Sequence, residues 1–219
     1  AFAADHPEVQ VVAGHAWLTY GRLQPAATNA LLYGFALPAG LGVALWLIAR
    51  LGRVPLRLGG LALVGTVVWN AGVKLGLLGI LGGDSTGYEW LEMPRYAAPV
   101  LFAGYGLIGV SALVTFKDRR EGRLYVSQWF LLVALFWFPW IFSTAEILVS
   151  FAPLRGVMPA VVAWWYAANL AALWFGFVGL AALFYLLPTL RDRPLFSQYY
   201  AMLAFWVRAL FGGWGGVPQ

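Results

Sequence analysis

Three charged residues stand inside the long apolar stretches of this 219-residue chain: Lys74, Glu146 and Arg208. A charge at the centre of a membrane-spanning helix costs about 2.5–3.5 kcal/mol on insertion scales, so such residues often mark ion pairs, proton relays or binding sites. Lys74 and Glu146 fall near the same ends of two apolar stretches that run in the same direction, where they could form an ion pair or a proton-relay element. The alternative is that Lys74 extends its ammonium to the interface and Glu146 faces the outer interface.

Arg208 lies about ten residues into the last apolar stretch. Its planar guanidinium suits a propionate, a lipid phosphate or a carboxylate on another subunit. Alternatively, Arg208 marks a helix that ends early, because the glycine-rich stretch 212–216 follows it.

Metal-binding side chains are scarce in the chain. It contains no Cys, which excludes disulfides, thiolate metal sites and covalently attached c-type haem. Its two histidines, His6 and His15, both precede the first apolar stretch. Imidazole is the usual haem ligand, so these residues could ligate a haem that belongs to a partner, but exposed histidines on a surface segment are the commoner case. The sequence contains no P-loop, Ser/His/Asp arrangement or carboxylate cluster.

The composition defines the class of protein. Hydrophobic residues make up 62% of the chain and charged residues 11%, and the mean hydropathy is +0.76. Soluble domains carry roughly 25% charged residues, so the chain is predicted to be an all-α, polytopic membrane protein. Its net charge of +5 is not a nucleic-acid signal, because the basic residues cluster in loops beside apolar spans.

Six transmembrane helices are expected within a single domain over residues 1–219. The loops after the first, third and fifth helices hold most of the Lys and Arg, which places them inside and the N-terminal segment 1–25 outside. Small residues four apart, as in Gly72–Gly76, predict close helix packing. The expected helices are about 26–49, 58–81, 96–116, 124–151, 159–187 and 199–214.

The fifth expected helix has no charge and begins beside an aromatic cluster, Trp164, Trp165 and Tyr166. These rings could stack on a haem or a quinone, although interfacial anchoring explains them without a ligand. The outer loop 84–95 is acidic, and it could steer a basic c-type cytochrome to this face. An acidic outer loop is also expected without any partner, because the positive-inside rule keeps Lys and Arg in the loops on the other side of the membrane.

Two stretches carry a family resemblance. Residues 17–30 read Trp-Leu-Thr-Tyr-Gly-Arg-Leu-Gln-Pro-Ala-Ala-Thr-Asn-Ala, and residues 164–169 read Trp-Trp-Tyr-Ala-Ala-Asn. The first resembles the entry to the second helix in subunit I of cbb-type, C-family haem–copper cytochrome c oxidases, where Gly-Arg-Leu-Arg-Pro-Leu-His-Thr-Asn-Ala supplies a haem ligand. The second is similar to the family's Trp-Trp-Tyr-Gly-His-Asn, whose His binds the active-site copper. Supporting matches at 124–130 and 188–206 extend the resemblance over most of the chain, in the family's order.

The departures from this pattern fall on the metal ligands. Ala27 stands at the position of the haem-ligand His, and Ala168 at that of the copper-ligand His. An alanine methyl has no lone pair for a metal. The family's subunit has about twice as many helices as this chain supplies, and the abrupt ends of the chain favour a portion of a longer protein.

The resemblance therefore implies a degenerate oxidase-type subunit of a bacterial inner-membrane electron-transfer complex. It would serve as a scaffold for other membrane subunits without haem or copper of its own, and a lipid or quinone could occupy the vacated haem cavity. One alternative is an active oxidase or nitric oxide reductase subunit that binds haem b through displaced ligands. Another is an ion-conducting or transport protein in which Lys74, Glu146 and Arg208 line a path.

Overall fold

The computed structural model describes residues 17–122, 124–152, 154–193 and 197–213, which form an all-helical bundle. The expected fold class is confirmed: the described residues make six continuous helices, and three of these contain π-helical segments. The segments are α2 (Tyr20–Asn29), η2 (Ala30–Ala36), α3 (Leu37–Gly52), α4 (Gly59–Gly82), α5 (Ala98–Lys117), α6 (Val126–Glu146), η3 (Ile147–Phe151), α7 (Met158–Asn169), η4 (Leu170–Phe175), α8 (Gly176–Arg191) and α9 (Gln198–Phe211).

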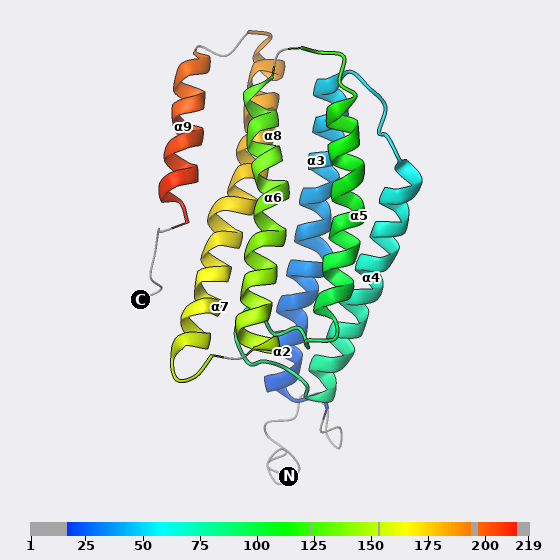
Figure 1. The fold of residues 1–219 in the computed structure, drawn as a ribbon, viewed down its shortest axis with the longest axis vertical. Coiled ribbons are helices and arrows are strands. Elements are labelled where there is room, and N and C mark those ends of the chain that lie inside the picture. Colours follow the sequence, from blue (N-terminus) through cyan, green and yellow to red (C-terminus); the bar gives the residue numbers. More distant parts are fainter. Residues whose placement is uncertain (1–16, 123, 153, 194–196, 214–219) are drawn as a thin grey trace.

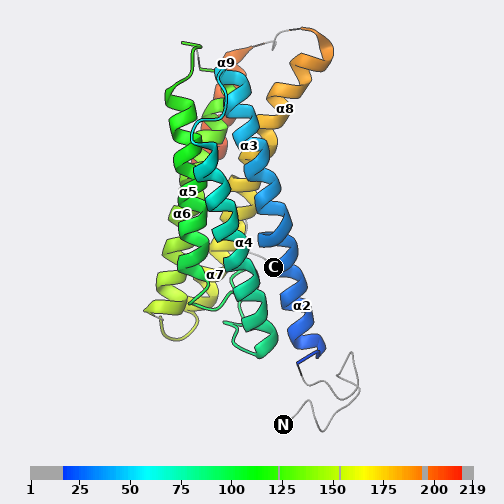
Figure 2. The same cartoon turned by 90° about the vertical axis from the view of Figure 1, so that its right-hand side faces the viewer.

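The helices run up and down the long axis of the bundle (Figure 1). α4 lies at one edge and α9 at the opposite edge, with α3, α5, α6 and α8 between them. Turning the molecule shows α3 and α8 diverging toward the end that carries the α8–α9 connection (Figure 2). We call this the basic end, because Arg50, Arg53 and Arg57 lie in or beside its α3–α4 loop.

Five of these helices are long and apolar enough to cross a membrane. They cover Tyr20–Gly52, Gly59–Gly82, Ala98–Lys117, Val126–Phe151 and Met158–Arg191. The last helix, α9, has only 14 residues, or about 21 Å at 1.5 Å per residue, and falls short of the roughly 30 Å hydrocarbon core. The sequence predicts a sixth span here, whereas the helix ends at Phe211 because Gly212 and Gly213 follow in a turn.

The first helix begins at Tyr20, six residues before the expected start near residue 26. Thr19 has extended backbone angles and precedes it, and Pro25 stands inside the helix. A proline removes one backbone donor, which a helix tolerates most easily close to its beginning. The side chain of Asn29 donates to the Pro25 carbonyl at 2.9 Å, one turn before it on the same helix.

Glycines bring α4 and α5 into backbone contact. A Cβ added at Gly104 would lie 2.7 Å from the Trp69 backbone nitrogen, and one at Gly65 would lie 2.9 Å from the Gly104 carbonyl oxygen. No larger side chain fits at such an approach without moving a helix. Gly72, Gly76 and Gly79 continue the same buried face of α4, as the small-residue spacing predicts.

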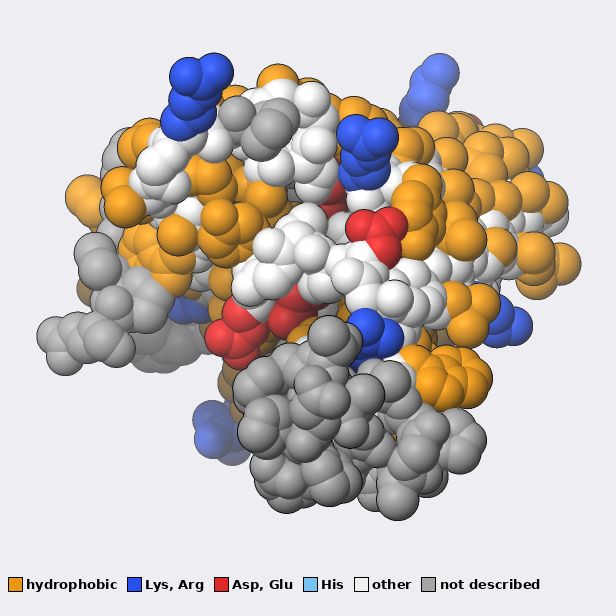
Figure 3. Space-filling view, turned by 90° about the horizontal axis from the view of Figure 1, so that it is seen from below, with side chains coloured by type: hydrophobic (Ala, Val, Ile, Leu, Met, Phe, Trp, Pro, Cys, Tyr) orange, Lys and Arg blue, Asp and Glu red, His pale blue; other side chains and the backbone are white. Residues whose placement is uncertain are grey.

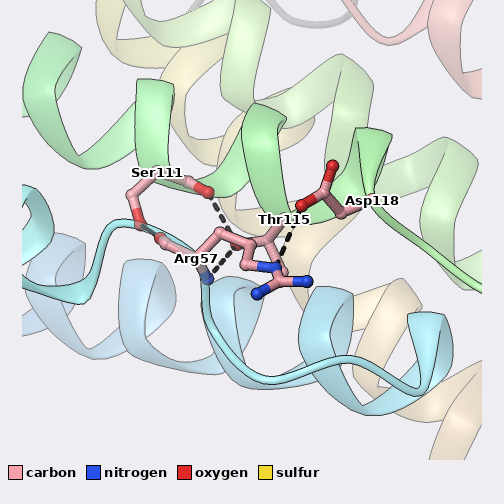
Figure 4. A network of polar contacts seen from close by, with 4 residues as sticks. All are labelled: Arg57, Ser111, Thr115 and Asp118. Atoms are coloured by element: carbon pink, nitrogen blue, oxygen red, sulfur yellow. Dashed lines mark hydrogen bonds and ion pairs between the residues drawn. The ribbon is translucent and has the colours of Figure 1, made fainter.

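The α3–α4 loop is fixed to the end of α5 by a compact polar network (Figure 4). The Arg57 backbone N–H donates to Thr115 Oγ1 at 2.9 Å, and Ser111 Oγ donates to the Arg57 carbonyl at 2.6 Å. The Arg57 guanidinium completes the network with Asp118 at 3.0 Å. This loop therefore holds one end of the α4–α5 pair in register.

Candidate functional site around the two alanine positions

Ala27 and Ala168 lie on different helices, each just before a π-helical segment. Ala27 is an exposed residue of α2, three positions before η2, and Ala168 is a partly buried residue of α7, two positions before η4. A π segment inserts a wider turn into an α-helix and often occurs at functional sites. The helix is therefore irregular just after both positions. Neither alanine can bind a metal, because its methyl group has no lone pair.

The described residues do not fit a haem–copper centre. No group of three or more His, Cys, Asp or Glu side chains among them is arranged to hold a metal ion. The only histidines of the chain, His6 and His15, lie outside the described residues. A haem iron or copper ion needs imidazole, thiolate or comparable donors, so methyl groups at both positions give this part of the chain no ligand set.

Two buried asparagines accompany the two alanines. Asn29 follows Ala27 by two positions, and its side-chain amide donates to the carboxylate of Glu92 in the α4–α5 loop. Asn169 follows Ala168 directly; it donates to the Trp165 carbonyl at 2.9 Å and accepts from Trp137 Nε1 at 3.2 Å. Buried amides need such partners. Each asparagine thus ties its helix to a neighbouring element.

The two helices are also joined by their tyrosines. The hydroxyls of Tyr33 in η2 and Tyr166 in α7 lie 2.8 Å apart, and both side chains are fully buried. The Tyr33 hydroxyl also contacts the Trp90 carbonyl at 2.8 Å. Trp90 has a φ of 67°, an uncommon left-handed conformation for a tryptophan, and this contact helps to hold it there. The tyrosine pair is the central polar contact of the site.

The two π segments that follow the alanines, η2 and η4, each present a backbone carbonyl to a side chain from another helix. Trp69 Nε1 on α4 donates to the Tyr33 carbonyl of η2 at 2.8 Å. Arg208 on α9 donates through Nε and a terminal nitrogen to the Ala172 carbonyl of η4, at 3.0 and 2.7 Å. A widened turn leaves carbonyls in need of such partners. These contacts hold α4 and α9 against the segments beside the alanines.

The sequence leaves two interpretations of Arg208 open, a residue that binds an anion or the sign of a helix that ends early. Its guanidinium contacts a backbone carbonyl within the described chain, whereas the sequence suggested a propionate, a phosphate or a carboxylate. The other interpretation, a helix that ends early, agrees with the end of α9 at Phe211. The carbonyl that Arg208 contacts belongs to η4, a segment that could not be inferred from apolar spacing alone.

Lys74 and Glu146 do not meet in the described structure. Lys74 is exposed on α4, and α5 lies between α4 and α6 (Figure 1). Glu146 is only 3% exposed in α6, and neither of its carboxyl oxygens has a hydrogen-bond partner among the described residues. Glu146 therefore does not face the outer interface either. It points into the helical core, since α6 turns its Ala145–Glu146 face inward.

Of the three aromatic residues singled out by the sequence, Tyr166 is buried and the two tryptophans are half-buried. Trp165 packs edge-to-face on Trp140 with ring centroids 5.7 Å apart. Trp164 instead lines an open cavity of about 430 Å³ beside Ala168. The cavity lies between α7 and the α4–α5 loop, and its lining is Tyr88, Glu89, Trp90, Ala160, Ala163, Trp164, Ala167 and Ala168.

The end of the bundle beside this cavity is shown in Figure 3, where acidic side chains gather near the middle of the face. Asp84 and Glu89 of the α4–α5 loop are exposed, in keeping with the acidic loop that the sequence predicts. Glu92 of the same loop is only 7% exposed. Burial raises the pKa of its carboxyl, and the hydrogen bond from Asn29 partly opposes that rise.

Sequence reasoning missed Tyr33, Asn29 and the inward position of Glu92. A tyrosine in the middle of an apolar span is a usable signal, because its hydroxyl must find a partner when buried. The burial of Glu92 has no comparable signal, since its neighbours in the sequence belong to an exposed acidic loop. Its position depends on how that loop folds back over α2.

The fold and the site together define a polytopic helical membrane protein with buried polar contacts in its interior and no metal-binding side chain at positions 27 and 168. The chain belongs to the Cytochrome C and Quinol oxidase polypeptide I family, the family of haem–copper oxidase subunit I, whose sequence model matches residues 2–217. The family resemblance drawn from the two motifs is therefore confirmed at this level, and with it a multi-pass membrane location.

Individual relatives are distant. The chain is 25% identical to a cytochrome c oxidase subunit 1 of Rhodobacter capsulatus, over 99% of the chain and 42% of that protein. It is 28% identical to a cytochrome c oxidase subunit 1 homolog of Azorhizobium caulinodans, over 91% and 38% of the two lengths. A Cbb3-type cytochrome c oxidase subunit CcoN1 of Stutzerimonas stutzeri is 25% identical over 91% and 44%. The chain thus spans about two-fifths of the length of these relatives.

Proposed function

We propose that this chain is a catalytically degenerate oxidase-type subunit of the cbb class, which serves as a membrane scaffold in a bacterial electron-transfer complex. The observation that carries the proposal is the pair Ala27 and Ala168 within a frame of buried polar contacts. The tyrosine pair and the asparagines hold helices together whether or not a metal is present. Such contacts suit a subunit that retains its shape for its partners.

The proposal places the protein in the bacterial inner membrane, with its basic end inside and the α4–α5 loop outside. Lys and Arg accumulate in the loops of the basic end, in keeping with the positive-inside rule. The partners would be other membrane subunits of a respiratory complex, and the acidic α4–α5 loop suits the approach of a c-type cytochrome from the outer side. The apolar part of the cavity beside Ala168 suits a lipid chain or a quinone ring.

The test is the cofactor content of the full-length protein, purified with its complex from native membranes. Optical spectra of the reduced protein, a pyridine haemochrome assay and metal analysis should find no haem b and no copper that belongs to this subunit. One haem b per chain would overturn the proposal. His6→Ala and His15→Ala variants then decide the alternative of displaced ligands, because only that alternative expects either variant to lose haem.

A further inference from the structure

A stripe of polar side chains runs along the outer face of α4. Thr66, Asn70 and Lys74 follow one another at four-residue spacing, so their side chains lie on one side of the helix, and all three are exposed. Their neighbours on the same face, Leu63 and Val67, are 66% and 62% exposed. The opposite face of α4 is occupied by the glycine contact with α5. We call Thr66, Asn70 and Lys74 the α4 polar stripe.

The α4 polar stripe lies deep in the membrane-spanning part of the helix. α4 has 24 residues, and Asn70 is its twelfth, close to the centre. Lys74 precedes the end at Gly82 by eight residues, or about 12 Å. Lys74 can extend its ammonium toward a lipid headgroup, but the short side chain of Asn70 cannot reach one. A lipid phosphate therefore accounts for one residue of the stripe at most.

Bonds within α4 leave part of the stripe available for a partner. Thr66 Oγ1 donates to the Ala62 carbonyl at 2.9 Å, and Asn70 Nδ2 donates to the Thr66 carbonyl at 2.8 Å. Among the described residues, no hydrogen bond reaches Asn70 Oδ1 and no ion pair involves Lys74. An acceptor and a cation thus point outward one helical turn apart. Polar side chains in hydrocarbon are characteristically covered by another helix.

We propose that the α4 polar stripe docks a transmembrane helix of a partner subunit that carries an Asp or Glu at the depth of Lys74 and a hydrogen-bond donor beside Asn70. A second copy fits poorly, since two copies in one membrane share their orientation and a two-fold contact through this face would place Lys74 against Lys74. α4 also lies at the edge opposite α9, the last described helix (Figure 1). The proposal deepens the scaffold function by naming one partner surface.

The experiment uses the full-length protein in native membranes. A photo-crosslinking amino acid is placed at Val67, with the equally exposed Phe136 of α6 as the control position; both side chains are 62% exposed. Irradiation at Val67 should give one adduct of defined mass whose peptide is a transmembrane segment with a carboxylate. The control position should not give that adduct.

Variants of the stripe then test its chemistry. Lys74→Glu should lower the yield of the adduct about ten-fold, and Asn70→Leu should lower it less, about three-fold. Lys74→Arg should keep the yield. Replacing the partner's Asp or Glu by Lys should restore the yield of the adduct in the Lys74→Glu variant, because the two charges are then opposite again. Lys74 is exposed in this chain, so these substitutions leave its internal packing intact.

Three outcomes would overturn the inference: adducts with lipid alone, adducts with a second copy or with another part of the same chain, or a yield that Lys74→Glu leaves unchanged. None of these depends on cofactor content. The discovery of haem on this chain would remove the scaffold proposal and leave the crosslinking result standing, so the two proposals fail independently.

Discussion

Two helix contacts in this bundle are built on opposite principles. α4 and α5 meet backbone to backbone through Gly65 and Gly104. The helices that carry Ala27 and Ala168 meet instead through large side chains, the tyrosine pair Tyr33 and Tyr166. The first contact depends on the absence of side chains and the second on hydroxyl partners. The part of the fold around Ala27 and Ala168 is joined by buried hydrogen bonds although neither alanine can bind a metal.

The difference predicts that the glycine contact tolerates change least. Gly104→Ala should destabilise the protein by about 1–3 kcal/mol, because the new Cβ meets the Trp69 backbone nitrogen at 2.7 Å and backbone cannot rotate away. Thermal unfolding in nanodiscs measures the effect. The matched control is Gly106→Ala on the same helix, where the added Cβ has no neighbour within 4 Å and a gain in helix propensity is expected. Equal midpoints for the two variants would remove the glycine contact from the comparison.

The tyrosine contact should be the weaker of the two. Tyr33→Phe should cost about 1 kcal/mol, because the lost hydroxyl contacts both Tyr166 and the Trp90 carbonyl. Tyr166→Phe should cost less, since its hydroxyl contacts only Tyr33 among the described residues. A double-mutant cycle should give a coupling of about 0.6 kcal/mol, the usual value for hydrogen bonds in membranes.

The control for the tyrosine pair is Tyr185→Phe, whose hydroxyl accepts a long, exposed hydrogen bond of 3.4 Å from Arg50. The unfolding midpoint of this variant should equal that of the unsubstituted protein within error. Additive effects of Tyr33→Phe and Tyr166→Phe would show that the two hydroxyls are neighbours without an energetic connection, and the contrast with the glycine pair would then be one of shape alone.

The smallest expected effect concerns Glu92 beside Asn29. Burial raises the pKa of Glu92, so its neutral form is favoured in the folded protein. The stability that this carboxyl contributes is therefore complete below its unfolded pKa of about 4.5 and is lost as pH rises through the folded pKa. Unfolding midpoints measured between pH 4 and pH 8 should show this decline. Glu92→Gln, which keeps a neutral hydrogen-bonding side chain, should flatten the profile, and a slope that persists in this variant would assign the decline to another group.

The sequence by itself determined the class of this protein and most of its helices. Apolar stretches long enough to cross a bilayer favour helices, because every backbone polar group of a helix finds a partner within its own segment. That Ala27 and Ala168 stand at the ligand positions of the two motifs stays a prediction, which rests on the register set by their flanking residues.

Only the tertiary structure decided where the polar side chains point. An apolar span reads the same whether it is a straight α-helix or contains a π segment, so η2 and η4, and with them the contacts of Tyr33 and Arg208, were not predictable from hydropathy. Lys74 and Glu146 share a depth in the sequence pattern, but rotation of α4 and α6 about their axes separates them: one is exposed and the other buried. The depth of a residue in the bundle follows from its position along its helix. Whether its side chain is buried or exposed depends on packing against helices that are distant in sequence.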